Sequence, residues 1–333
     1  MRCVQMTAVG GPDVLQVADL PRPEPGPGQV RVRLAAAGIN PVDTKVRANG
    51  PFAPDAEPPV ILGCDGAGTL DALGQGVTGV EPGQRVLFMN GGIGLDPGNY
   101  AEYTTVDARF VVPIPEGVGD LEGAALPLVA LTAWEGLFDR ARLGAGEWVL
   151  IHGGAGGVGH VAIQLARQAG ARVMTTVSDD EKARIARDSG AEAIIRYRDE
   201  DFVEAVRHWT EGEGVGVVLD TVGGETCARS VHALATYGRL VSILAFPADL
   251  DWKHARLHNL TLAQELMLTP MILGRDDFRL HQTGILRECV ARVADGRLQV
   301  RVAGTYPLEQ AIQAHRRLEA GGLAGKLVLT IQG

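Results

Sequence analysis

The chain has 333 residues with a formal net charge of −9, and 46% of the residues are hydrophobic while 21% are charged. This length predicts two domains, the composition excludes a disordered chain, and the acidic balance disfavours nucleic acid or an anionic membrane surface as the main partner. Glycine is in excess, with 44 residues against an ordinary usage of about 7%, which indicates many backbone positions of positive φ or close approach.

The first 120 or so residues predict a β-rich domain. Short runs of strand-forming residues at 29–34, 60–62, 85–88 and 100–106 alternate with turns rich in glycine and proline. Many turns in a region of this size are typical of a small, bent, barrel-like domain.

From about residue 123 the sequence changes to an alternation of strands and helices. A helical stretch at 121–137 leads to an apolar strand at 148–151 and an amphipathic helix at 158–168. This alternation predicts a doubly wound parallel sheet, an α/β fold. The further strands are expected at 172–177, 193–197, 215–222 and 240–246, and the further helices at 181–189, 201–209 and 226–237, with Gly238 just past the end of the last helix.

After about residue 268 the alternation loosens. Helices are expected near 285–295 and 308–320, with strands at 301–304 and 326–331. Some sixty residues make a marginal domain alone, so we expect this tail to complete the first domain. The predicted domains are therefore 1–122 with 269–333, and 123–268.

The most informative motif is the glycine cluster that follows strand 148–151. It contains G-x-G-x-x-G at Gly154, Gly156 and Gly159, between an apolar strand and an amphipathic helix. In this arrangement, backbone N–H groups at the helix N-terminus bind a pyrophosphate, which side chains larger than glycine would keep away. The motif predicts a dinucleotide-binding site. The alternative is a tight turn without a ligand.

The end of the next strand bears on which dinucleotide binds. An NAD site usually has Asp or Glu there to bind the ribose 2′-OH, whereas this strand ends at Ser178, followed by Asp179, Asp180 and Lys182. Ser178 leaves room for a 2′-phosphate that Lys182 could neutralise, which favours NADPH. If Asp179 points inward, NAD is preferred, and a third reading is that Asp179 or Asp180 caps the following helix.

With these residues, the chain resembles the medium-chain dehydrogenase/reductase superfamily, and most closely its zinc-independent, zeta-crystallin-like quinone oxidoreductase branch. The resemblance extends over nearly the full length and implies a GroES-like catalytic domain beside a Rossmann domain. The motifs that carry it are AGINPVD (37–43), LGCDGAG (62–68), PGQRV (82–86), YAEY (100–103), LPLVALTAW (126–134), HGGAGGVG (152–159) and LAGKLV (323–328).

The resemblance also implies which residues bind the cofactor. Lys182 and Tyr197 would bracket the adenosine phosphate, although Tyr197 could be only a strand-end aromatic residue and Lys326 a solvated surface charge. The expected cofactor-binding residues are Asn40, Thr132, Gly154, Gly156, Gly157, Val158, Gly159, Ser178, Lys182, Tyr197, Thr221, Leu244 and Lys326.

The sequence departs from the zinc alcohol dehydrogenases of this superfamily. Asn40 and Cys64 stand where the first cysteine and the histidine ligand of the catalytic zinc would be, and an apolar residue near Leu128 takes the third position. One cysteine cannot hold a catalytic zinc, and segment 89–98 has no cysteine for a structural zinc lobe. We therefore expect no metal. All the cysteines are far apart, which predicts reduced thiols.

Without a metal to polarise the substrate, we expect an acceptor that is already electrophilic, a quinone or an α,β-unsaturated carbonyl compound, reduced by hydride from NADPH. The resemblance implies that Asn40, Asp43 and Lys45 face a cleft between the domains, with Cys64 on its wall. Asn40 could donate a hydrogen bond to the substrate oxygen or to the nicotinamide ribose, and Lys45 could stabilise developing negative charge. The alternative for Asp43 is a buried structural acceptor of nearby backbone groups.

Two other functions remain open. One is an enoyl-thioester reductase of the same superfamily, and the other is a non-catalytic, NADPH-binding structural or RNA-binding relative, against which the acidic balance weighs. Relatives suggest a homodimer formed through the apolar segment 260–268 as an edge strand. With no signal core and no membrane-spanning apolar run, we expect a cytoplasmic protein that binds neither nucleic acid nor membrane.

Overall fold

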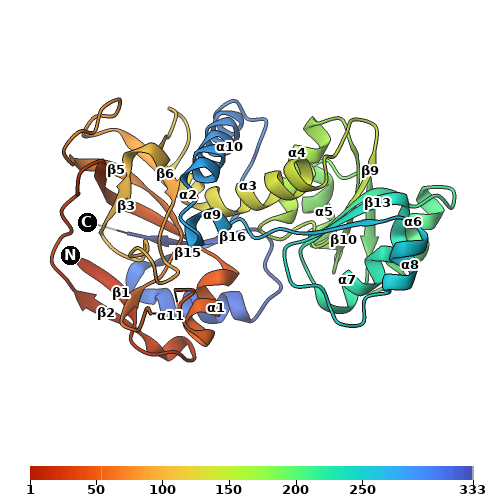
Figure 1. Cartoon of the computed structure of the whole chain (residues 1–333), viewed down its shortest axis with the longest axis horizontal. Helices are drawn as coiled ribbons and strands as arrows, with labels where there is room; N and C mark the ends of the chain where they lie inside the picture. The colour runs from red at the N-terminus through yellow and green to blue at the C-terminus, as the bar shows by residue number, and fades with distance from the viewer. Residues whose placement is uncertain (54, 332–333) are drawn as a thin grey trace. The chain divides into compact units, whose positions relative to one another are not determined.

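The computed structural model describes residues 1–53 and 55–331, which form two compact units (Figure 1). Unit 1 is Met1–Leu128 with Leu268–Gly333, and unit 2 is Val129–Met267. The last two residues of the chain, within the tail expected to complete the first domain, lie outside the described part. Each unit is built on its own sheet system.

Unit 1 contains a small sheet and a large one. The small sheet has the order β2-β1-β4, and the large sheet has the order β15-β16-β3-β5-β6-β8, with β7 also paired to β3. Because β16, from the end of the chain, pairs with β3, the tail is part of the large sheet. The strands are β1 (Arg2–Met6), β2 (Leu15–Asp19), β3 (Gln29–Ile39), β4 (Val60–Ile61), β5 (Asp65–Leu73), β6 (Arg85–Met89), β7 (Tyr103–Asp107), β8 (Val112–Pro113), β15 (Val302–Pro307) and β16 (Lys326–Thr330).

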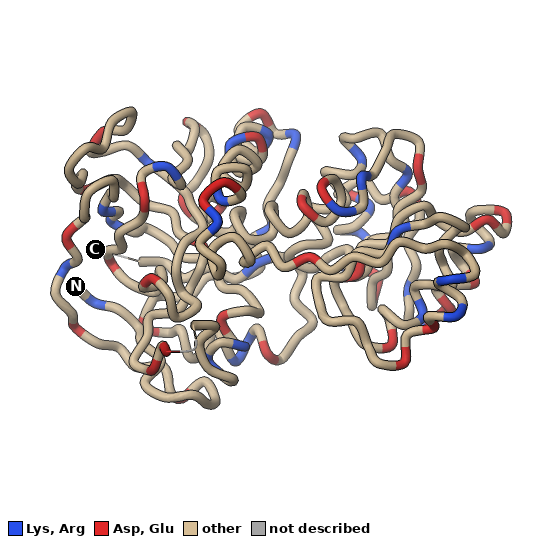
Figure 2. Tube along the Cα trace, viewed as in Figure 1, with Lys and Arg blue, Asp and Glu red and all other residues tan. Residues whose placement is uncertain are grey.

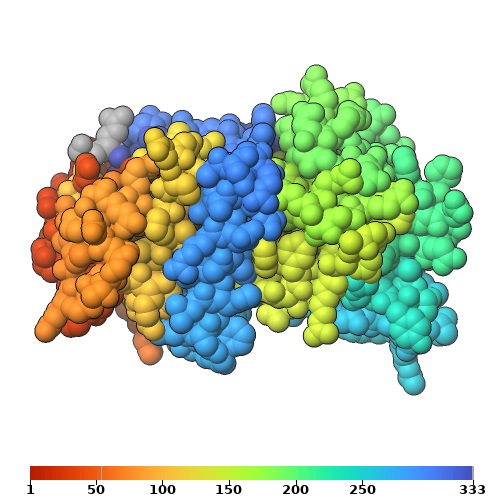
Figure 3. Space-filling view, turned by 90° about the horizontal axis from the view of Figure 1, so that it is seen from above, coloured from red at the N-terminus to blue at the C-terminus, as the bar shows by residue number. Residues whose placement is uncertain are grey.

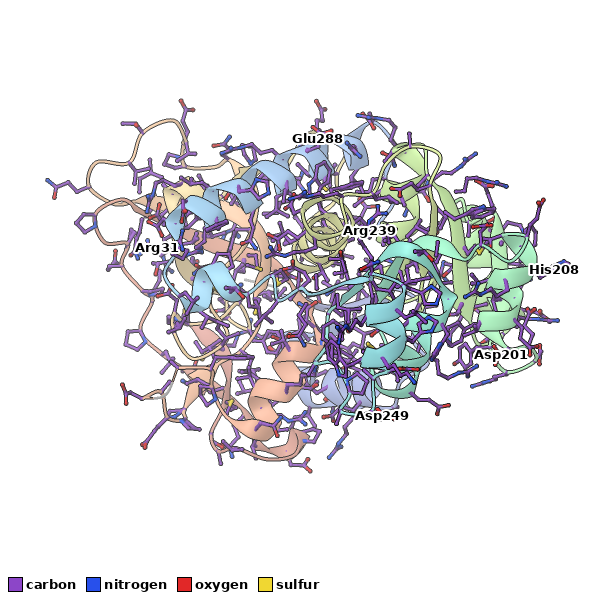
Figure 4. All side chains as sticks on the ribbon, turned by 45° about the vertical axis from the view of Figure 1, so that its right-hand side comes forward. Arg31, Asp201, His208, Arg239, Asp249 and Glu288 are labelled. Atoms are coloured by element: carbon purple, nitrogen blue, oxygen red, sulfur yellow. The ribbon has the colours of Figure 1, made fainter. Side chains whose placement is uncertain are left out.

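Helices pack around these sheets. They are α1 (Pro41–Asn49), α2 (Asp120–Ala125), α9 (Thr269–Ile272), α10 (Asp276–Ala294) and α11 (Ala311–Glu319), with short 3-10 turns η1 (Pro12–Val14), η2 (Ala108–Phe110) and η5 (Leu308–Gln310). Figure 3 shows α10 as a blue band beside the orange-to-yellow surface that includes β8 and η2, which α10 contacts. Arg279 of α10 stacks on Phe110 of η2 at 3.8 Å from the ring centroid, while Glu288 extends from the exposed face of the helix (Figure 4).

Unit 2 has one six-stranded sheet in which every neighbouring pair of strands is parallel. Its order is β11-β10-β9-β12-β13-β14, which is the 3-2-1-4-5-6 order of dinucleotide-binding folds. This confirms the predicted doubly wound sheet. The strands are β9 (Trp148–Ile151), β10 (Arg172–Val177), β11 (Ala193–Arg196), β12 (Val215–Asp220), β13 (Leu234–Ser242) and β14 (Thr261–Gln264).

The helices of unit 2 connect these strands. The strands are nearly continuous apolar runs because both faces of the sheet are buried, and Leu150, Val218 and Leu240 are fully buried in its core. The helices are α4 (Gly159–Gln168), α5 (Asp180–Asp188), α6 (Phe202–Trp209), α7 (Gly224–Ser230) and α8 (Trp252–Leu257), with the 3-10 turn η4 (Val231–Ala233); α3 (Pro127–Trp134), continued by the π-helix η3 (Glu135–Arg140), leads into the unit.

One helix prediction is wrong in its bounds. The helix expected at 226–237 ends at Ser230, and Gly238 lies inside β13 rather than past a helix. Strand pairing that starts at Val215 and Leu234 overrides the helical propensity of this alanine- and leucine-containing stretch. The helical stretch expected at 121–137 is confirmed: it consists of α2, α3 and the start of η3, and it is interrupted before Pro127, which cannot continue α2.

Charged residues of both signs are interspersed along each unit (Figure 2). Many form ion pairs, such as Arg31 with Asp71 at 2.6 Å in unit 1. In unit 2, Arg239, which is labelled in Figure 4, donates to both carboxylate oxygens of Glu147 at 2.8 Å. None of the helices in the described residues is long and apolar enough to cross a membrane.

We predict that Gly68→Ala destabilises the chain by about 1–3 kcal/mol, because overpacking shifts the backbone. A Cβ atom at Gly68 would lie 2.1 Å from the carbonyl oxygen of Arg33, on the neighbouring strand. Urea unfolding measures the effect. The control is Gly284→Ala in α10, where the added Cβ meets nothing within 4 Å and should stabilise by ~0.5–1 kcal/mol. Equal unfolding midpoints for the two variants would contradict the prediction.

Candidate functional site

The turn between β9 and α4 is the first candidate feature. A Cβ atom at Gly154 would lie 2.1 Å from Thr175 Oγ1, and one at Gly159 would lie 2.2 Å from the carbonyl oxygen of Gly153. Glycine is therefore required at these two positions by packing within the turn. Helix α4 begins directly after it, and the N-cap residue Val158 provides no side-chain hydrogen bond to the first turn. Such a helix N-terminus, with Gly156 and Gly157 in the loop before it, can bind an anion through backbone N–H groups.

A buried histidine, His152, is part of the hydrogen-bond network next to this turn. His152 Nδ1 lies 3.1 Å from Thr176 Oγ1, and its Nε2 lies 3.0 Å from Ser230 Oγ. The same Thr176 hydroxyl accepts the N–H of Gly153 at 3.2 Å. Burial lowers the pKa of His152 to about 4, so the ring is neutral and acts as a structural link. His152 was part of the glycine motif, but its role as a support has no sequence signature.

The end of β10 brings Ser178, Asp179 and Lys182 together. Asp179 is the N-cap of α5 and accepts the N–H of Lys182 at 3.0 Å, which confirms the capping alternative. Its other carboxylate oxygen accepts the hydroxyl of Ser178 at 2.7 Å. Lys182 Nζ donates to Ser178 Oγ at 2.8 Å and lies 3.6 Å from Asp179 Oδ2. The backbone N–H of Lys182 is the main cause that lowers the pKa of Asp179.

The other predicted cofactor residues of unit 2 follow three different strands or lie on α3. Tyr197 follows β11, donates its backbone N–H to the carbonyl oxygen of Val177 at 3.2 Å, and is 52% exposed. Thr221 follows β12 and donates to the carbonyl oxygen of His152 at 2.7 Å, beside the glycine turn. Leu244 follows β13 and lies against Gly223. Thr132 is buried on α3.

Unit 1 contains a buried cluster that we call the polar centre: Asn40, Asp43, Asp65 and Lys326. Lys326 is 4% exposed and the other three are fully buried, so the alternative of a solvated surface charge for Lys326 is wrong. Its ammonium group donates to the carbonyl oxygen of Ile39 at 3.1 Å and to Asn40 Oδ1, and lies 3.5 Å from Asp65 Oδ2. Asn40 Nδ2 donates to Asp65 Oδ2 at 2.8 Å. Burial lowers the pKa of Lys326, and Asp65 opposes this effect.

Asp43 is held at the first turn of α1. Its Oδ2 accepts the N–H of Asn40 at 2.8 Å, as in a capping box, and the hydroxyl of Tyr100 at 3.1 Å. This confirms the alternative that Asp43 is a buried acceptor of nearby backbone. Burial raises the pKa of Asp43 to about 7, against the opposing effect of the Asn40 N–H.

The structure does not bring Lys45 into the polar centre. Lys45 is exposed on α1, and its position two residues after Asp43 turns it by about 200° around the helix. Cys64, next to Asp65, is fully buried, and burial raises the pKa of its thiol well above the usual range, so the thiol is neutral. Within residues 1–53 and 55–331 there is no group of three or more His, Cys, Asp or Glu residues arranged to hold a metal.

Four residues around the polar centre were not identified from the sequence. Asp65 and Tyr100 lie within the motifs LGCDGAG and YAEY, and a lone carboxylate amid small apolar residues is the signal that could have revealed Asp65. Arg47 and His315 had no such signal, because their contact joins α1 to α11 only in the folded chain. Arg47 Nη1 lies 3.1 Å from His315 Nδ1, and His315 Nε2 lies 3.1 Å from the Tyr100 hydroxyl.

Family models match both parts of the chain. The model of the alcohol dehydrogenase GroES-like domain matches residues 26–116, which supports the GroES-like prediction for unit 1. The model described as zinc-binding dehydrogenase matches residues 189–329.

Similar proteins cover the whole chain. A quinone oxidoreductase of Pseudomonas aeruginosa is 34% identical over 327 residues, 98% of either chain. A segment of a phenolphthiocerol/phthiocerol polyketide synthase of Mycobacterium tuberculosis is 35% identical, and this chain spans only 15% of that protein.

Solved structures are also similar to this chain over nearly its full length. An alcohol dehydrogenase superfamily protein of Novosphingobium aromaticivorans superposes with a TM-score of 0.92 at 33% identity, covering 100% of both chains. The quinone oxidoreductase of Escherichia coli complexed with NADPH superposes with a TM-score of 0.88 at 29% identity, covering 99% of this chain and 100% of that one.

We predict that Lys326→Met destabilises the chain by about 3–5 kcal/mol, because it leaves the carboxylate of Asp65 buried without its cation. The free energy of unfolding from urea titration measures the loss. Lys45→Met on the exposed side of α1 is the matched control and should stay within about 0.5 kcal/mol of the parent. A loss for Lys326→Met as small as that of the control would show that the buried ion pair is not needed for stability.

Proposed function

The chain belongs to the quinone oxidoreductase branch of the medium-chain dehydrogenase/reductase superfamily and is an oxidoreductase, and we propose that it transfers hydride from NADPH to a quinone or an α,β-unsaturated carbonyl compound. The observation that carries the proposal is the hydrogen bond from the ammonium group of Lys182 to the hydroxyl of Ser178, at the end of β10 and beside the glycine turn. This pair offers a cation and a hydroxyl where a dinucleotide with a 2′-phosphate needs them.

The residues of unit 2 fit such a cofactor. The backbone of Gly156, Gly157 and Val158, at the N-terminus of α4, would bind the pyrophosphate. Ser178 and Lys182 would bind the 2′-phosphate, together with the exposed ring of Tyr197. The NADPH complex of the E. coli relative supports this choice. When bound, NADPH supplies the hydride, and the chain supplies binding and orientation.

In unit 1 we assign Asn40 as the group that orients the substrate. Lys326 and Asp65 hold both ends of its carboxamide, so its direction is set before a ligand binds, which lowers the cost of alignment. The ammonium of Lys326 adds positive charge next to it, which favours negative charge that develops on a substrate oxygen. Quinones and enones are already electrophilic, and solvent can protonate the anion that they form.

A second candidate is reduction of an enoyl thioester. The 35% identity to a segment of a polyketide synthase favours it. The chemistry is closely related, because both classes accept hydride at a carbon conjugated to a carbonyl group.

We expect rapid oxidation of NADPH when the protein is mixed with 1,4-benzoquinone, 9,10-phenanthrenequinone or a small enone. Stopped-flow absorbance measures the rate, with crotonyl thioester as the parallel substrate for the second candidate. Turnover of the thioester alone would replace the first candidate by the second. Tight NADPH binding without turnover of any acceptor would contradict both and favour a non-catalytic relative.

For the cofactor, Lys182→Ala should raise the KM for NADPH by about 10- to 100-fold and leave the KM for NADH unchanged, since a charge-assisted bond to the 2′-phosphate is worth ~1.5–3 kcal/mol. Steady-state kinetics with both cofactors measure this. Arg184→Ala, on an exposed position of the same helix, is the control and should change neither KM. An equal effect of Lys182→Ala on both cofactors would count against NADPH specificity.

We also propose that the protein forms a homodimer through β14. This strand is outermost in the sheet of unit 2, and Leu257 just before it is 75% exposed. Leu257→Lys should weaken the dimer at least tenfold in sedimentation equilibrium, because it brings a charge to the interface. Leu273 of unit 1 is 66% exposed, and Leu273→Lys, the control, should leave the strength of the dimer unchanged. A monomeric parent chain would disprove this arrangement.

A further inference from the structure

The two buried carboxyl groups of the polar centre have unequal sets of partners. Asp65 receives donors on both oxygens: the N–H of Leu128 at 2.9 Å on Oδ1, and Asn40 Nδ2 at 2.8 Å on Oδ2. Asp43 receives its two donors, from Asn40 and Tyr100, on Oδ2 only. Among the described residues, Asp43 Oδ1 is fully buried and has no hydrogen-bond partner.

Lys326 cannot supply the missing donor. An ammonium group has three N–H bonds, and the three nearest acceptors are the carbonyl oxygen of Ile39, Asn40 Oδ1 and Asp65 Oδ2. Its hydrogens are therefore all assigned, and its nearest carboxylate is Asp65. Lys326 is therefore the cationic partner of Asp65 and not of Asp43.

A chain of hydrogen bonds determines where the proton of Tyr100 lies. Arg47 has only donors, so His315 Nδ1, 3.1 Å from Arg47 Nη1, must accept, and the hydrogen of the neutral ring is on Nε2. Nε2–H then donates to the Tyr100 oxygen, which leaves the hydroxyl hydrogen for Asp43 Oδ2. Burial lowers the pKa of His315 to about 3, in agreement with a neutral ring.

Of the charged groups nearest Asp43, Asp65 raises its pKa and Lys326 lowers it, and Lys326 is bound to Asp65 rather than to Asp43. Arg47 is paired with Glu319, and burial keeps the Cys64 thiol and the Tyr100 hydroxyl neutral by raising the pKa of each. An ionised Asp43 would thus hold an unsolvated, unpaired charge on Oδ1. In a neutral carboxyl group with its hydroxyl on Oδ1, Oδ2 is a carbonyl oxygen that accepts two hydrogen bonds, as observed. The O–H on Oδ1 also lacks a partner, but this costs less than an unpaired buried charge.

We propose that Asp43 titrates across the neutral pH range, is protonated on its acidic side, and serves as a positioning residue that acts on the reaction through Asn40. In the neutral form it accepts the N–H of Asn40 and leaves Lys326 and Asp65 as a balanced pair. Loss of the proton to solvent adds a second buried negative charge beside Asn40 and opposes negative charge on the substrate. This effect on the reaction rests on the proposed function, whereas the proton on Asp43 does not.

The proton can be observed directly by infrared spectroscopy of the full chain. The difference between the parent and Asp43→Asn, which has the shape of the neutral carboxyl group, should contain a protonated-carboxyl C=O band that disappears with a pKa near 7. A difference spectrum that contains only carboxylate bands at pH 6 would overturn the proposal.

A second variant tests the assignment without replacing Asp43. Tyr100→Phe removes a donor that favours the ionised form, so the pKa of the band should rise by about one pH unit. Tyr103→Phe is the matched control, since the Tyr103 ring packs on the guanidinium group of Arg22, whose central carbon lies 4.3 Å from the ring centroid. Equal band pKa values for the two variants would overturn the proposed arrangement.

The positioning role is tested by the pH dependence of kcat/KM for NADPH oxidation by the best quinone. In the parent, kcat/KM should fall above a pKa near 7. Tyr100→Phe should shift this fall upward together with its infrared band, and Asp43→Asn should lack it. The same fall in Asp43→Asn would overturn the positioning role. Absence of turnover with every acceptor would overturn the proposed function and with it this role, while the infrared band would still decide whether Asp43 carries the proton.

Discussion

The architecture of unit 1 depends on one buried ammonium group, that of Lys326. β16 carries Lys326 and pairs with β3, and Asp65 begins β5 on the other side of β3. The ammonium thus joins three neighbouring strands at the point where β3 leads into α1. Removing an ammonium and a carboxylate from water costs several kcal/mol per ion, and only a nearly complete set of hydrogen bonds offsets this. Ile39, Asn40 and Asp65 provide that set.

A different constraint organises unit 2. Because its strands are parallel, their carboxyl ends meet at one edge of the sheet. The glycine turn after β9, Ser178 after β10, Tyr197 after β11 and Thr221 after β12 therefore lie along that edge, although they are distant in the sequence. Hydroxyl groups connect the turn to its neighbours: Thr176 binds the N–H of Gly153, and Thr221 binds the carbonyl oxygen of His152.

Sequence patterns were reliable where local periodicity and sheet burial agree. The alternation of apolar strands with amphipathic helices predicted the parallel sheet, and the doublet at Asp179 and Asp180 included the observed cap of α5. They failed at 226–237, where helix-forming residues enter β13, because pairing with β12 outweighs local propensity. Sequence patterns also could not show that Asp43 is buried while Lys45 is exposed, since short spacing in a sequence does not reveal which face of a helix is buried.

The sequence by itself determined the class of fold and the glycine turn, because both follow from local spacing along the chain, whereas the wider set of expected cofactor residues came from the family resemblance. Only the tertiary structure decided the environment of the charged groups. Lys326 is a buried cation rather than a surface charge, Asp65 is its partner, and Asp43 is bound to Tyr100 and through it to His315. Protonation depends on burial and on donors from distant segments, and the folded chain alone brings those donors together.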